Sequence, residues 1–79
     1  MILTYPYIDD ANLLHDYLVS SIQGFRRVYQ DEHGIDHAHA DSGHIDWLPS
    51  GPYTVHCSDT LDPELVDLHV QNYMKNMRR

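Results

Sequence analysis

Two short alternating segments, separated by turn residues, constrain the fold of this chain most strongly. Residues 44–47 and 53–57 each alternate apolar and polar side chains, and the five residues between them are Leu-Pro-Ser-Gly-Pro. A five-residue connection pairs the apolar residues on one face of a β-hairpin, whereas a four-residue connection mixes both kinds on each face. The predicted pairs are Trp47 with Tyr53 and Ile45 with Val55 inside, and Asp46 with Thr54 and His44 with His56 outside.

The remaining segments predict a strand and two helices around this hairpin. Residues 2–7 are β-prone and short, which indicates an edge strand or an extended arm. Apolar residues then recur at helical spacing, predicting a long amphipathic helix over about residues 10–31, with Asp9 as N-cap and Gly34 as stop. Residues 32–43 show no period and are predicted to be a loop. A C-terminal helix over 62–77 should begin at Asp62-Pro63.

These elements predict one small α+β domain spanning residues 1–79. The helix and hairpin patterns also nominate a hydrophobic core. Its predicted members are Leu14, Leu18, Ile22, Phe25, Tyr29, Ile45, Trp47, Val55, Val66, Val70, Tyr73 and Met77. Cys57, the single cysteine, lies on the same face of the hairpin and is expected to be a small apolar filler. A lone thiol suits a reducing compartment, and neither a signal peptide nor a membrane span is evident, so a cytoplasmic protein is expected.

Charge is distributed unevenly along the chain. Residues 28–74 contain no lysine or arginine but hold nine carboxylates and six of the seven histidines, and the formal net charge is -7. Such a surface attracts cations and basic proteins and disfavours direct contact with nucleic acid or anionic lipid. The leading interpretation is therefore a non-enzymatic acidic protein without a cofactor. It would occupy a basic, nucleic-acid-binding surface of a partner, as a nucleic-acid mimic and inhibitor of the kind phages or mobile elements encode. The residues predicted to make this contact are Asp31, Glu32, Asp36, Asp41 and Asp46, with Arg26 and Arg27 at its edge.

The histidines suggest a second interpretation, a divalent-metal site. Imidazole and carboxylate groups are ligands for zinc, nickel and cobalt. His37 and His39 converge if their segment is extended, and His44 and His56 face each other across the predicted hairpin. The metal ligands in this interpretation are His37, His39, His44 and His56, with zinc as the expected ion. A solvated polar loop and a pH-sensing cluster explain the same residues and stay open as alternatives.

A third interpretation is a small assembly subunit that binds through the apolar surface of helix 62–77, and a homodimer is possible. An enzyme is the least supported class. His56 and Cys57 are adjacent on a predicted strand and point to opposite faces, so they cannot act as a catalytic pair. Ser42 lacks the strand-turn-helix setting of a nucleophile, and no glycine-rich phosphate loop is present.

Overall fold

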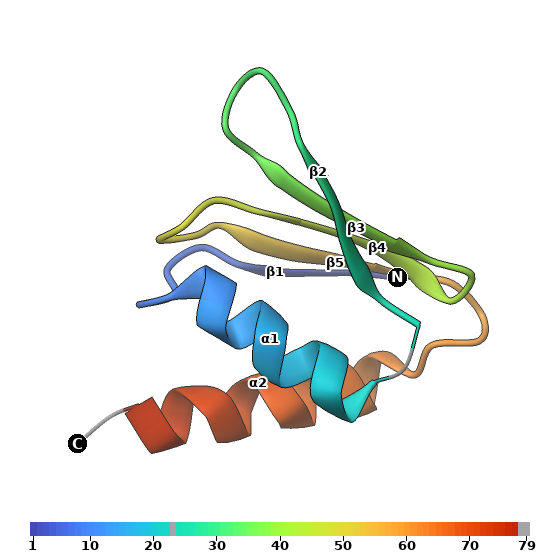
Figure 1. Ribbon diagram of the computed structural model, residues 1–79. Coiled ribbons are helices and arrows are strands. Elements are labelled where there is room, and N and C mark those ends of the chain that lie inside the picture. Colours follow the sequence, from blue (N-terminus) through green and yellow to red (C-terminus); the bar gives the residue numbers. More distant parts are fainter. Residues whose placement is uncertain (23, 78–79) are drawn as a thin grey trace.

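A five-stranded antiparallel sheet forms one layer of the protein, and two helices cover one of its faces (Figure 1). The computed structural model describes residues 1–22 and 24–77. The strand order is β1-β5-β4-β3-β2. The elements in chain order are β1 (Ile2–Tyr5), α1 (Ala11–Ser21), β2 (Arg26–Gln30), β3 (Asp36–Ala40), β4 (Gly43–Trp47), β5 (Tyr53–Cys57) and α2 (Pro63–Met77). The predicted α+β class is confirmed.

The predicted hairpin is confirmed residue by residue. Strands β4 and β5 pair Trp47 with Tyr53, Ile45 with Val55, Asp46 with Thr54 and His44 with His56. β1 pairs with the free side of β5 and forms one edge of the sheet, as expected for residues 2–7, although the strand ends at Tyr5. Gly43 opens β4 at a position where a Cβ atom would overlap the carbonyl oxygen of His56. A side chain there would therefore force the two strands apart.

The long helix predicted over residues 10–31 is wrong beyond its middle. Helix α1 ends at Ser21, and Ile22 is already extended. Gly24 comes next in the described chain with a positive φ of 100°, a conformation that glycine adopts at little cost. The chain then forms strand β2 instead of a further helical turn. The predicted stop, Gly34, lies instead in the turn between β2 and β3, also with positive φ.

The segment predicted as a loop contains strand β3. Asp36–Ala40 alternates histidines on one face with small residues on the other, and it pairs with both β2 and β4. The N-cap of α1 is Asp10 rather than Asp9, because the Asp10 side chain accepts from the Leu13 backbone N–H at 3.1 Å. The predicted start of α2 at Asp62-Pro63 is confirmed, and the Asp62 side chain accepts from the Glu64 N–H at 2.9 Å.

Most of the predicted core lies between the sheet and the helices. Nine of its twelve members are buried: Leu14, Leu18, Phe25, Ile45, Trp47, Val55, Val66, Val70 and Tyr73. Ile22 is partly buried against them, and Cys57 is a buried filler as expected. Tyr29 is the error, since it is 48% exposed on β2. The side chain of Met77 lies outside the described residues.

Candidate metal centre on the outer face of the sheet

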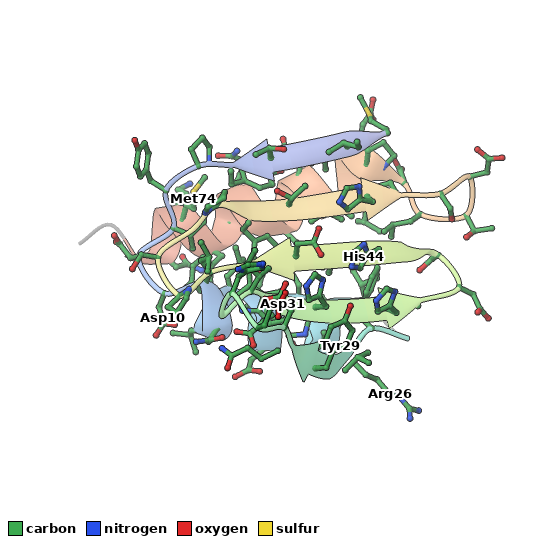
Figure 2. All side chains as sticks on the ribbon, turned by 90° about the horizontal axis from the view of Figure 1, so that it is seen from above. Asp10, Arg26, Tyr29, Asp31, His44 and Met74 are labelled. Atoms are coloured by element: carbon green, nitrogen blue, oxygen red, sulfur yellow. The ribbon has the colours of Figure 1, made fainter. Side chains whose placement is uncertain are left out.

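The face of the sheet opposite the helices carries a group of histidines and carboxylates. Figure 2 looks onto this face, where His44 and Tyr29 project from the strands and Asp31 lies near one end of them. The group arises because residues two apart on a strand share a face, and β3 lies beside β4 with His37 opposite Asp46 and His39 opposite His44. The strand order thus brings together side chains from two separately predicted segments.

Three ligand atoms of this group converge. The Oδ1 atom of Asp46 lies 2.6 Å from His37 Nδ1 and 2.8 Å from His44 Nε2. The two ring nitrogens are 3.3 Å apart. Within residues 1–22 and 24–77, these are the three His, Cys, Asp or Glu side chains whose ligand atoms all lie within 4.8 Å of one another. We refer to His37, His44 and Asp46 as the triad.

The contacts inside the triad do not satisfy all of its polar atoms. Asp46 Oδ1 is buried and makes no hydrogen bond of acceptable geometry, despite its two nearby ring nitrogens. A buried carboxylate oxygen without a partner is costly, unless a proton or a cation occupies the space that it faces. Asp46 Oδ1 and the two ring nitrogens nevertheless approach one another as closely as the ligands of a shared ion do.

Asp31 orients the His37 ring from outside the triad. His37 Nε2 donates a hydrogen bond to Asp31 Oδ2 at 2.9 Å, and Asp31 Oδ1 accepts from the backbone N–H groups of His33 and Ile35 at 2.8 and 3.0 Å. The hydrogen bond to Asp31 raises the pKa of His37, and the same bond lowers the pKa of Asp31. With the proton held on Nε2, His37 Nδ1 presents its lone pair to the triad. A carboxylate behind a histidine is a recurrent arrangement in protein metal sites.

Three further rings surround the triad. His56 Nε2 donates to the second carboxylate oxygen of Asp46 at 3.2 Å, and its ring stacks near His44 at a centroid distance of 5.2 Å. His39 stacks on the other side of His44 at 4.2 Å, and Tyr29 stacks on His37 at 4.7 Å. Burial among these groups lowers the pKa of His44, which keeps its imidazole neutral and able to act as a ligand.

The predicted metal set is therefore brought together only in part. His37 and His44 converge, whereas His39 and His56 lie outside the group of ligand atoms and support it by stacking and by the bond to Asp46. Sequence reasoning missed Asp46 as a ligand. The signal was present, because the predicted hairpin register already placed Asp46 on the same outer face as His44 and His56.

The five acids predicted to contact a partner do not form one surface. Asp36 is 1% exposed on the core side of β3, so its side chain does not lie on the surface, and its contact with a partner stays a prediction. Asp31 and Asp46 are engaged with histidines on the outer face. Glu32 and Asp41 are exposed, but they lie in the turns at opposite ends of β3. Arg26 is exposed on β2, and the side chain of Arg27 lies outside the described residues.

Helix α2 turns most of its apolar side chains inward. Val66, Val70 and Tyr73 belong to the core, which leaves Leu65 and Leu68 exposed at 44% and 55%. The surface predicted for assembly is thus largely used by the domain itself, and binding through the two exposed leucines stays a prediction.

No protein family, curated protein or solved structure matches this chain. Over the described part of the chain, neither helix has the length and apolar character required to cross a membrane.

Proposed function

We propose that this protein binds one divalent first-row transition-metal ion, with zinc as the representative ion, through His37, His44 and Asp46. The observation that carries the proposal is the convergence of His37 Nδ1, His44 Nε2 and Asp46 Oδ1 within 2.6 to 3.3 Å of one another. Ligand atoms bound at about 2.0–2.2 Å to one ion are roughly 2.9 Å apart at a right angle and roughly 3.4 Å apart at a tetrahedral angle. The observed separations bracket the right-angle value.

The donor set determines the class of ion. Two imidazole nitrogens and one carboxylate oxygen suit zinc, cobalt, nickel and iron(II), whereas calcium and magnesium prefer oxygen ligands alone. In the metal-free protein, the 3.3 Å contact between the two ring nitrogens accommodates a proton on one of them. An ion that binds the triad displaces this proton.

An ion at this position would also stabilise the domain. His37 belongs to β3, and the other two ligands belong to β4, so the ion links adjacent strands near the middle of the sheet. Small domains bury little apolar surface per residue and commonly gain stability from a metal or a disulfide. This protein has one cysteine, which excludes an internal disulfide. Ligand binding to the folded state alone raises the free energy of unfolding.

Isothermal titration calorimetry of the EDTA-treated, untagged protein with zinc tests the proposal. We expect one ion per chain, and a loss of binding in His44→Ala. The matched control is His33→Ala, which removes a side chain that is 74% exposed and lies 3.5 Å from Glu32, and which leaves the His33 backbone N–H in place. His33→Ala should bind zinc as the unmodified protein does. An absence of stoichiometric binding, or equal losses in the two variants, would refute the site.

The binding of a basic partner surface stays a prediction, as do the non-enzymatic role and the cytoplasmic location. The geometry supports partner binding less well than it supports metal binding, because two of the five acids face histidines and one is buried. A pull-down at graded salt concentration separates the two functions. An acidic interface weakens steeply as salt increases, whereas metal binding responds to chelator.

A further inference from the structure

We propose that an ion held by the triad keeps open coordination positions that face solvent and take exchangeable water or a small monoanion. This inference rests on the proposed metal site and specifies what the site does with its ion. A metal site that is closed by four protein ligands is structural, whereas one with an open position binds exogenous ligands and can polarise them.

The protein supplies three ligands and holds its other candidates elsewhere. His56 Nε2 lies against Asp46 Oδ2 at 3.2 Å, so it engages the carboxylate rather than the point where the three ligand atoms meet. That contact also occupies the second oxygen of Asp46 and favours single-oxygen coordination of the ion. Both oxygens of Asp31 are engaged, one with His37 and the other with backbone N–H groups.

The separations within the triad place the three ligands on one side of the ion. Values of 2.6, 2.8 and 3.3 Å are close to those of three mutually perpendicular bonds. The three side chains would therefore hold an ion from one side. Its other half is then free for further ligands, as in two-histidine, one-carboxylate sites with open positions.

Neither helix of the described chain covers that half. Both helices pack on the opposite face of the sheet, and side chains of the strands project from the outer face (Figures 1 and 2). The side chains of His37, His44 and Asp46 are 15%, 31% and 29% exposed. The Oδ1 atom of Asp46 is itself buried, so solvent meets the exposed parts of these three side chains on the outer face.

The charge around the site favours water or a monoanion over a multiply charged anion as the additional ligand. A divalent ion together with the carboxylates of Asp46 and Asp31 is formally neutral when the histidines are neutral. The chain as a whole carries a formal charge of -7. A multiply charged anion such as phosphate is therefore disfavoured, whereas water or a small monoanion adds little repulsion.

Cobalt(II) provides the test, because its visible absorption reports its coordination. The full chain is loaded with cobalt, binding is established by calorimetry, and azide is titrated while the visible bands are recorded. We expect a saturable shift that fits one azide per cobalt, and no shift with phosphate at the same concentrations. His33→Ala serves as the matched control and should give the same azide response.

The outcomes separate this inference from the proposed function. A chain that binds no cobalt and no zinc overturns both. A chain that binds cobalt but shows no azide response retains the metal site and overturns the open position. Two results would identify the ligand that fills the remaining coordination position in that case. An azide response that appears only in His56→Ala assigns it to His56, and a cobalt-dependent dimer in analytical ultracentrifugation assigns it to a second copy. A shift with phosphate as strong as that with azide overturns the charge argument.

Discussion

Replacing Asp31 by Asn tests the role of the carboxylate behind His37. The amide has nearly the shape of the carboxylate and keeps an oxygen that can accept from the His33 and Ile35 N–H groups. It removes the charged oxygen that now lies 2.9 Å from His37 Nε2. Without that acceptor the ring loses its preference for the tautomer that presents the Nδ1 lone pair to the triad.

The expected effect is a loss of zinc affinity. Replacing such a supporting group typically costs about 10- to 100-fold in affinity. We expect a value near the lower limit, about 10-fold, because the Asp31 side chain is 25% exposed and water can replace part of its interaction. The affinity is measured at neutral pH by competition with a chromophoric zinc chelator. Urea unfolding of the metal-free variant shows that its fold is retained.

Glu32→Gln is the matched control, since it removes the same charge one residue away. Glu32 is exposed, and its carboxylate lies 3.5 Å from the His33 ring. Its removal should change zinc affinity by less than about twofold, as screened surface charges contribute little. Unchanged affinity in Asp31→Asn would refute the orienting role. Equal losses in the two variants would show that overall charge, rather than the hydrogen bond, determines affinity.

Three further predictions concern the fold. Trp47 is 1% exposed and donates to Asn12 at 2.8 Å, so Trp47→Ala should lower the free energy of unfolding by about 3–5 kcal/mol in urea titrations, and a near-normal midpoint would contradict the packing. Gly43→Ala should cost about 1–3 kcal/mol by pushing β4 from the His56 carbonyl, and a stability equal to that of the unmodified protein would contradict the close approach. Burial raises the pKa of Tyr53, so folding favours its neutral form. This contribution to the free energy of unfolding is complete below the ordinary tyrosine pKa of about 10 and is lost as the pH rises above that value. Above it, the urea midpoint should therefore fall less steeply with pH in Tyr53→Phe than in the unmodified protein.

The sequence by itself determined the elements whose signals are local. The β4–β5 register follows from the alternation of two segments and the length of their connection, because a shift by one residue would turn every apolar side chain to solvent. The start of α2 follows from Asp62 and Pro63, whose capping and fixed φ act within one turn. Both predictions depend on residues that are close together in the chain.

Only the tertiary structure decided where α1 ends and that a strand succeeds it. The apolar spacing that continues through Phe25 and Tyr29 fits a helix, but the strand pairing of β2 with β3 outweighs that local preference. Strand β3 itself has a weak local signal, and it is stabilised by neighbours on both sides.

The candidate site was decided by the same long-range pairing. Composition identified histidines and carboxylates, but which of them converge depends on the placement of His37 opposite Asp46. A different neighbour for β3 would have left the same residues dispersed. The sequence therefore supplied the ligand types, and the sheet order selected His37, His44 and Asp46 from among them. The physical reason is that the ligand atoms of one ion must meet at one point, and here they come from two strands whose pairing is a tertiary feature.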